Sequence, residues 1–313
     1  MKKILLPIDG AKHSSDALHY AVMMSGALED VVFSLFHVQP FLSEYVVEEA
    51  KKNPEANKKL KELQEKNAES GTKILQQHKE HLIRSGVAEE RIELLTRQRR
   101  EGVAKDIIQK ARSEYMDAIV MGRRGLSRLQ ETFIGSTTKN VIEHNADIPV
   151  WVVDGQISSQ NILLAVDGST SSAKALDHLV DIMHPNPEAE LTIFHVQPSL
   201  KDTCGIDFNA SSDAQDQEAV TKIVEHANRQ CMDNFMQHAR GRLKEKAFDE
   251  NQVNFKTQPV KRNIGKAIAD EFKQGDYGTV VVGKRGINKR FFMGSVSSYL
   301  ISHLTDAALW IVP

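Results

Sequence analysis

The fold is decided by a stretch that occurs twice in the chain, first as Lys3-Ile4-Leu5-Leu6-Pro7-Ile8-Asp9-Gly10 and again as Asn161-Ile162-Leu163-Leu164-Ala165-Val166-Asp167-Gly168. A second run, Phe36-His37-Val38-Gln39-Pro40, recurs letter for letter as Phe194-His195-Val196-Gln197-Pro198 at the same offset. Short apolar runs of this kind are typical of buried β-strands. Their return in the same order indicates a duplicated domain.

Three further segments near the end of each half correspond in the same order. The pairs are Gly122-Arg123-Arg124-Gly125 with Gly283-Lys284-Arg285-Gly286, Gly135-Ser136 with Gly294-Ser295, and Val150-Trp151-Val152-Val153 with Leu309-Trp310-Ile311-Val312. We therefore predict two domains, residues 1–154 and 161–313. The polar stretch from Asp154 to Gln160 is the predicted linker.

Short apolar runs alternate with segments of helical period in the first half. The predicted strands are Lys3 to Asp9, Val31 to Val38, Arg91 to Thr96, Ala118 to Gly122 and Pro149 to Val153. The predicted helices are Ser14 to Ser25, roughly Pro54 to Ser85, Val103 to Tyr115 and Ser136 to Asn145. Strands with little alternation, each followed by a helix, favour a parallel sheet covered on both faces. Each half is thus predicted to be an α/β, Rossmann-like, doubly wound domain with a five-stranded parallel sheet in the order 3-2-1-4-5.

Charge and hydropathy exclude several classes of protein. A net charge of −2 disfavours a sequence-independent nucleic-acid binder, which concentrates Lys and Arg. No stretch approaches the roughly 20 apolar residues of a membrane-spanning helix, so we expect a cytoplasmic protein with no membrane partner. Cys204 and Cys231 are the only cysteines, and Cys231 falls in an apolar helical stripe that predicts a packed thiol.

The residues that carry chemistry follow predicted strands. Ligands of open parallel sheets bind beyond the carboxyl ends of the strands where the winding direction reverses, and Asp9 and Gly122 are expected at two such neighbouring ends. Gly135 and Ser136 open the next helix, where unpaired amides, the helix dipole and the hydroxyls of Ser136, Thr137 and Thr138 can converge on an anion. Arg123, Arg124 and Arg128 add positive charge, so we expect the anion to be a phosphate group. The alternative is a tight turn followed by an ordinary N-cap.

These motifs resemble those of the universal stress protein family. The spacing Gly122-x2-Gly125-x9-Gly135-Ser136 is similar to that family's ATP-binding pattern, and the opening run and Phe36-His37-Val38 are similar to its first two strands. The resemblance covers nearly the whole chain, twice. It implies that Pro7, Asp9 and Val38 border the adenine and ribose, with Asp9 accepting hydrogen bonds from the ribose hydroxyls. It also implies that Gly122, Gly125, Gly135, Ser136 and Thr137 hold the phosphates of ATP, often with a divalent cation such as Mg²⁺.

The second half departs from the pattern in one loop. Asp167, Gly283, Gly286, Gly294 and Ser295 are all present as candidate nucleotide-binding residues. The segment between Gly286 and Gly294 is shorter than the one between Gly125 and Gly135. We therefore favour the first half as the nucleotide site.

Enzyme motifs are missing from the sequence. It has neither the Gly-x4-Gly-Lys-Ser/Thr loop of P-loop proteins nor a Gly-x-Gly-x2-Gly after the first strand, and no nucleophile motif or metal-ligand cluster is recognisable. His37 and His195 lie inside apolar strands and are interpreted as hydrogen-bonded core residues. His13 is expected near the ligand end of the first strand but is not assigned a catalytic role.

Three functions remain open at this stage. The first is an ATP-binding, stress-response regulatory protein without a catalytic centre, whose nucleotide alters the surface offered to an unidentified protein partner. The second is a slow ATPase or phosphotransferase, and the third is a nucleotide-free scaffold. The resemblance also implies that the two halves pair through their last strands, with further dimerisation of the chain left open. Trp151 and Trp310 are expected to fill either that contact or the core of their own half.

Overall fold

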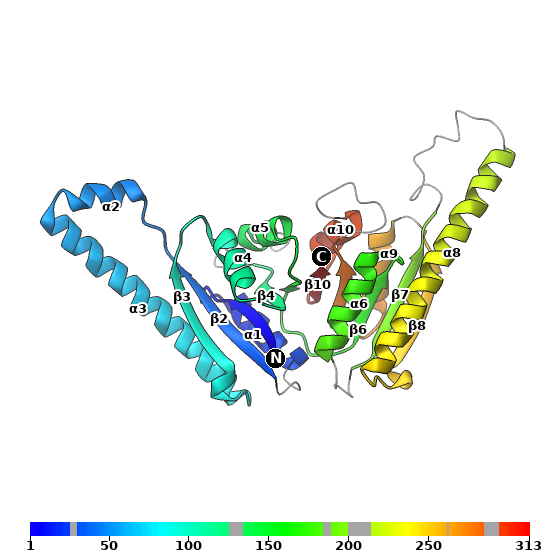
Figure 1. The fold of residues 1–313 in the computed structure, drawn as a ribbon, viewed down its shortest axis with the longest axis horizontal. Helices are drawn as coiled ribbons and strands as arrows, with labels where there is room; N and C mark the ends of the chain where they lie inside the picture. Colours follow the sequence, from blue (N-terminus) through cyan, green and yellow to red (C-terminus); the bar gives the residue numbers. More distant parts are fainter. Residues whose placement is uncertain (26–29, 125–133, 184–188, 200–213, 262, 285–293) are drawn as a thin grey trace. The chain divides into compact units, whose positions relative to one another are not determined.

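The computed structural model describes residues 1–25, 30–124, 134–183, 189–199, 214–261, 263–284 and 294–313 (Figure 1). The chain divides into two compact units, Met1–Gly155 and Gln156–Pro313, which we call domain 1 and domain 2. Each unit is built from strands that alternate with helices.

The described strands of domain 1 form one parallel sheet in the order β3-β2-β1-β4-β5. Their bounds are β1 Lys2–Pro7, β2 Val31–Gln39, β3 Ile92–Gln98, β4 Ala118–Gly122 and β5 Val150–Val153. Leu6 pairs with Leu35 on one side of β1, and Leu5 pairs with Ile119 on the other. The predicted order 3-2-1-4-5 is confirmed, and the winding direction reverses between β1 and β4.

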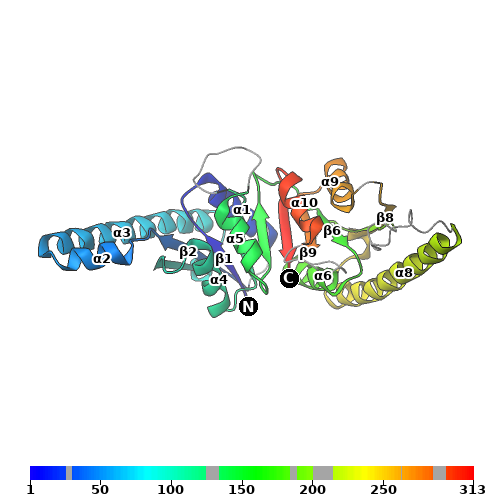
Figure 2. The ribbon, with the colours of Figure 1, turned by 90° about the horizontal axis from the view of Figure 1, so that it is seen from above.

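Helices cover both faces of the domain 1 sheet (Figures 1 and 2). Helices α1 and α3 pack together on one side, and α4 and α5 pack together on the other. The bounds are α1 Lys12–Ser25, α2 Glu44–Lys51, α3 Pro54–Arg84, a 3₁₀ turn Glu89–Arg91, α4 Val103–Ser113 and α5 Ser136–His144. All five residues of β4 are buried, as expected for a central parallel strand covered on both faces.

Domain 2 repeats this arrangement, with strands in the order β8-β7-β6-β9-β10. The strands are β6 Ile162–Val166, β7 Leu191–Gln197, β8 Val253–Pro259, β9 Thr279–Gly283 and β10 Ala308–Val312. The helices are α6 Thr170–Met183, α8 Ala214–Glu245, a 3₁₀ turn Glu250–Gln252, α9 Ile264–Gln274 and α10 Ser295–His303. The tandem α/β prediction is confirmed in both halves.

The long helices differ between the domains. In domain 1, α3 begins at Pro54 after Asn53, whose side chain accepts hydrogen bonds from the amides of Glu55 and Ala56, and it packs on β2 and β3. In domain 2, α8 packs mainly on α6. The edge strand β8 keeps Phe255 47% exposed as a result.

Two sequence predictions need correction. The first strand ends at Pro7 and not at Asp9, so Asp9 lies in the turn that leads into α1. Helix α2 was not predicted, although Ser43 caps it by accepting a hydrogen bond from the amide of Val46.

Candidate functional site

The candidate site of domain 1 lies where β1 and β4 end beside each other. The two strands are hydrogen-bonded neighbours on either side of the reversal in winding. Asp9 follows β1, Gly122 ends β4, and α5 begins at Ser136. The fold therefore brings together three of the segments that the sequence singled out.

Asp9 is half-buried, and its carboxylate accepts a hydrogen bond from the amide of Ala11, at 2.9 Å. Gly10, with φ of +80°, makes the turn that carries the chain into α1. Pro7 pairs with Phe36 of β2, and Val38, also half-buried, lies two residues further along that strand. Pro7, Asp9 and Val38 thus lie at the carboxyl ends of two adjacent strands.

The start of α5 carries no side-chain cap. Gly135 occupies the N-cap position with φ of −61° and ψ of 144°, so the N-cap residue itself offers no side-chain acceptor to the first amides of the helix. Ser136 is exposed and Thr137 is half-buried. Thr138 has a different role, because it is buried and its hydroxyl donates to the carbonyl oxygen of Gly122 at 2.9 Å.

At Gly122 the packing of α1 leaves no room for a side chain. A Cβ atom on Gly122 would lie 2.7 Å from both the Cβ and the carbonyl oxygen of His13 at the start of α1. Gly283 meets Ser171 in the same way, with 2.7 Å between the added Cβ and the Cβ of Ser171. The paired glycines let the first helix of each domain approach the end of the fourth strand closely.

Asp154 holds the two arginines that follow β4. The buried Arg123 donates from Nη1 to the carboxylate of Asp154 at 2.9 Å, and Arg124 donates from Nη2 to its other oxygen at 3.3 Å. Asp154 is only 6% exposed, so it is part of domain 1 and not of the predicted linker. Sequence analysis assigned both arginine charges to the phosphate and missed this partner. An acidic residue directly after the last strand is the signal that could have identified it.

Gly125 and Gly286 lie outside the described residues, as do Arg128 and the rest of both loops.

The corresponding site of domain 2 is more internally bonded. The carboxylate of Asp167 accepts hydrogen bonds from the amide of Ser169 at 3.0 Å and from the hydroxyl of Ser172 at 2.6 Å. Gly294 caps α10 without a side-chain contact, and Ser295 is exposed. Val296 stands where domain 1 has Thr137, so this helix start offers one hydroxyl fewer.

The sequence profile described as the universal stress protein family matches residues 1–154 and again residues 158–312. The chain belongs to the universal stress protein family. A universal stress protein of Methanocaldococcus jannaschii is 32% identical over 166 residues, which cover 49% of this chain and 81% of that protein. A universal stress protein of Mycolicibacterium smegmatis is 35% identical over 88 residues, covering 26% of this chain and 29% of that one.

A solved structure supports the fold of this universal stress protein. The crystal structure of a universal stress protein from Archaeoglobus fulgidus matches with a TM-score of 0.60 at 17% identity, covering 99% of this chain and 97% of that one. At this identity the match supports the fold alone.

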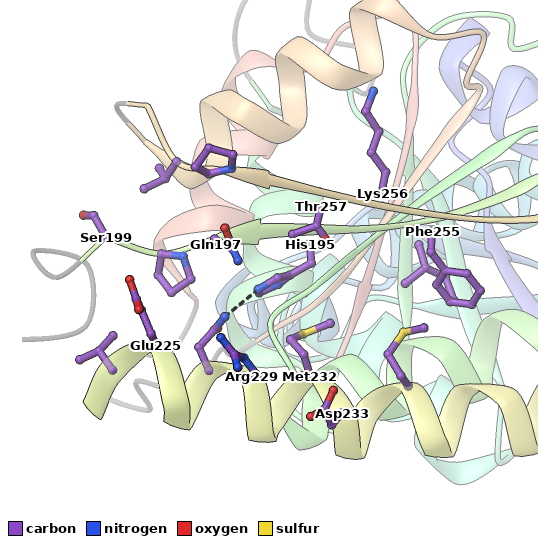
Figure 3. A pocket seen from close by; sticks show the side chains of 17 residues that line it. His195, Gln197, Ser199, Glu225, Arg229, Met232, Asp233, Phe255, Lys256 and Thr257 are labelled. Carbon is purple, nitrogen blue, oxygen red and sulfur yellow. Dashed lines mark hydrogen bonds between the residues drawn. The ribbon is translucent and has the colours of Figure 1, made fainter. Parts of the chain in front are cut away.

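Domain 2 of this universal stress protein has a cavity of 640 Å³ between α8 and the strands β7 and β8 (Figure 3). Its apolar lining includes Met232 and Met236 from α8 and Ile193 and Phe255 from the strands. The predicted nucleotide-binding residues of domain 2 that the structure describes, Asp167, Gly283, Gly294 and Ser295, do not line it.

The two strand histidines are hydrogen-bonded, as predicted. Nδ1 of His195 donates to the carbonyl oxygen of Val166 at 2.9 Å. This leaves Nε2 to accept from the side-chain nitrogen Nδ2 of Asn228 at 3.2 Å (Figure 3). Burial lowers the pKa of His195 below its ordinary value. Nδ1 of His37 donates to the carbonyl oxygen of Ile8 at 2.8 Å, and its ring packs against Gly71 of α3.

The part of the chain that the structure describes offers neither a membrane-spanning helix nor a cluster of metal ligands. None of its helices combines the length and apolar character that crossing a bilayer needs. No group of three or more His, Cys, Asp or Glu side chains in the same residues is arranged to hold a metal ion.

Proposed function

We propose that domain 1 of this universal stress protein binds ATP at the ends of β1 and β4 and acts as a nucleotide-dependent regulatory module. One observation carries the proposal: the Asp9 carboxylate and the uncapped start of α5 lie beyond neighbouring strands on either side of the topological reversal. This is where doubly wound sheets bind nucleotides. Membership of the universal stress protein family supports the same expectation, because the sequence motifs resemble that family's ATP-binding pattern.

Asp9 would bind the ribose of the nucleotide. Within the described residues its carboxylate accepts one hydrogen bond, from Ala11, so it has acceptor capacity left for the two hydroxyls of a ribose. Pro7 and Val38 lie beside it and offer apolar surface to a base. A nucleoside would therefore be oriented by one carboxylate and two apolar side chains.

The phosphate end would be the start of α5. The amides of the first turn and the positive end of the helix dipole favour an anion there, and the hydroxyls of Ser136 and Thr137 can donate to its oxygens. Arg124 adds charge while Asp154 fixes its position. A Mg²⁺ ion would arrive with the phosphates, since it is usually bound by phosphate oxygens and water.

Domain 2 would bind the nucleotide more weakly. Asp167 already accepts hydrogen bonds from the Ser169 amide and the Ser172 hydroxyl, so it has less acceptor capacity left for a ribose than Asp9 has. Val296 cannot donate to a phosphate oxygen as Thr137 can. We propose one principal nucleotide site per chain.

Regulation is proposed in preference to catalysis. His13 lies beside the end of β4, but its Nδ1 atom lies 4.0 Å from a carboxylate oxygen of Asp16 and its backbone is packed against Gly122. That position serves the packing of α1. The proposed output is a change in the surface that domain 1 offers to a protein partner when ATP binds.

Mass spectrometry of the small molecules that copurify with the chain tests the binding step. Retained adenine nucleotide supports it, whereas chain that is free of nucleotide and takes up none at millimolar ATP contradicts it and favours a scaffold.

Phosphate release from ATP tests the regulatory step. Gly135→Ala is the useful variant, because alanine adopts the φ and ψ of Gly135 without strain and therefore changes the space beside the helix start and not the fold. Turnover comparable to that of ordinary kinases, abolished by this change, would instead establish an enzyme.

A further inference from the structure

Two histidines meet at the contact between α1 and α3 in domain 1. Nε2 of His19 lies 2.5 Å from Nε2 of His81, and the two rings are 4.2 Å apart in an edge-to-face arrangement. His19 is exposed and His81 is half-buried. The pair lies outside the proposed nucleotide site and has no part in it.

The hydrogen bonds of the pair determine where its lone pairs point. Nδ1 of His19 is 2.8 Å from the carbonyl oxygen of Ser15, and a carbonyl can only accept, so Nδ1 carries the proton. Nε2 of His19 therefore presents a lone pair toward His81. The contact between the two Nε2 atoms then needs a proton on Nε2 of His81.

A third histidine, His78, lies on the same helix three residues before His81, but its ring is bonded elsewhere. His78 is itself held by its own helix, with Nδ1 donating to the carbonyl oxygen of Ile74 and Nε2 beside the hydroxyl of Ser15. Neutral imidazoles are the form that binds a metal ion.

We propose that His19 and His81 form a transition-metal site that joins α1 to α3, with Zn²⁺ or Cu²⁺ bound between the two Nε2 atoms. His81 would move its proton from Nε2 to Nδ1, so that both Nε2 lone pairs face the ion and no net proton is released. The bond from His19 Nδ1 to a backbone carbonyl is the support that metal-binding histidines commonly have. Two protein ligands leave the remaining positions to water.

The side chains need only a small adjustment to accept the ion. Two imidazole nitrogens on one tetrahedral Zn²⁺ ion lie about 3.3 Å apart, given Zn–N bonds of about 2.0 to 2.1 Å. The present separation is 2.5 Å. The exposed His19 ring can move outward by that difference without displacing buried atoms.

In domain 2 the matching contact, between α6 and α8, already holds the positively charged side chain of Arg242. Nε2 of His238 on α8 is 2.9 Å from the carboxylate of Asp177 on α6, and Arg242 donates to the same carboxylate at 2.8 Å. Hydrogen bonds to Glu245 and Asp177 raise the pKa of Arg242, so the guanidinium stays charged. This contact of domain 2 therefore offers no pair of facing imidazoles, and the proposal is one ion per chain.

Calorimetric titration of the chelator-treated full chain with Zn²⁺ alone, without nucleotide, tests the proposal. We expect one Zn²⁺ per chain, with affinity reduced at least tenfold in His19→Ala and in His81→Ala. His144→Ala is the matched control, because His144 is exposed and bonded to its own helix, and it should leave the affinity within twofold of the parent. Absence of uptake, or uptake unchanged in both site variants, would overturn the proposal.

Electron paramagnetic resonance of the parent chain with one equivalent of Cu²⁺ gives a test that needs no variant. Hyperfine structure from two imidazole nitrogens is expected. A spectrum with one nitrogen ligand or none would exclude the paired site.

Discussion

Asp9 and Asp167 occupy the same position in the two domains, yet their carboxylates have different partners. In domain 1, Ser14 donates to the carbonyl oxygen of Ala11 and leaves the Asp9 carboxylate with the Ala11 amide. In domain 2, Ser172 stands in the place of Ser14 and donates to Asp167 itself. A different choice of acceptor by one serine therefore gives Asp167 a hydrogen bond that Asp9 does not receive from Ser14.

The long helices of the two domains also pack differently. Helix α3 packs on β2 and β3, whereas α8 packs mainly on α6 and leaves a cavity above β7 and β8 (Figures 1 and 3). Duplication has thus retained the strand order and the paired glycines, while the surfaces around the candidate sites have diverged. We infer that the backbone defines the place for a ligand and that local side-chain contacts decide whether it is open.

The largest expected effect is on the stability of domain 1 in Asp154→Ala. Removing the carboxylate deletes the 2.9 Å ion pair of the buried Arg123, and removing one member of a buried ion pair costs about 3 to 5 kcal/mol. Urea denaturation in a Trp310→Phe background, followed by Trp151 fluorescence, measures it. Asp147→Ala, which removes an exposed ion pair with Arg112, is the control and should cost less than about 1 kcal/mol. A cost below about 1 kcal/mol for Asp154→Ala would show that the buried pair is not needed.

A smaller effect, equal in the two domains, is expected from Gly122→Ala and Gly283→Ala. Each added Cβ would come within 2.7 Å of the first helix of its domain, and overpacking of this kind costs about 1 to 3 kcal/mol. Thermal unfolding of the two variants measures it. Gly241→Ala in α8 is the control, because nothing lies near its added Cβ and alanine favours a helix by about 1 kcal/mol. Unequal losses would mean that the glycines have different roles in the two domains.

The strand order could be predicted from the sequence, whereas the packing role of Gly122 could not. The alternation of apolar runs and helical segments predicted the strand order, because central strands such as β4 are buried on both faces and leave a continuous apolar run. Gly122 was predicted only as an approach point for an anion, since its contact with His13 depends on where α1 lies on the sheet.

Contacts between distant segments could not be predicted from one sequence. The choice of Asp154 as the partner of Arg123 and Arg124 depends on β4 and β5 ending side by side. The meeting of His19 with His81 depends on how α1 packs on α3. The hydrogen bonds of His37 and His195 were predicted, because an imidazole inside an apolar strand needs a partner when it is buried.

Amide variants of Asp9 and Asp167 test whether the two carboxylates contribute differently to ATP binding. Asp9→Asn should weaken ATP binding by at least about tenfold, since a hydrogen bond to a charged acceptor contributes about 1.5 to 3 kcal/mol. Asp167→Asn should change it less than twofold, because we propose that domain 2 is not the principal site and because Asp167 already accepts two hydrogen bonds. Fluorescence titration with an ATP analogue measures both. Equal losses would remove the distinction between the domains.

The smallest effect concerns pH and domain 2. Burial lowers the folded-state pKa of His195 below its ordinary value of 6.5, so the unfolded chain binds more protons as the pH falls through that range. Stability of domain 2 should therefore be retained above pH 6.5 and decrease below it, and His195→Gln should flatten this dependence. Urea midpoints between pH 7.5 and 5.5, followed by Trp310 fluorescence, measure it. A stability that rises on acidification would show that His195 gains a proton-stabilising partner on folding.

Calorimetric titration of the full chain with ATP in the presence of Mg²⁺ distinguishes one nucleotide site per chain from two. We expect one principal site per chain, which is lost when Ser136 and Thr137 are both replaced by Ala and is retained in Ser295→Ala. Two equal sites, or one site that disappears only with Ser295→Ala, would contradict it.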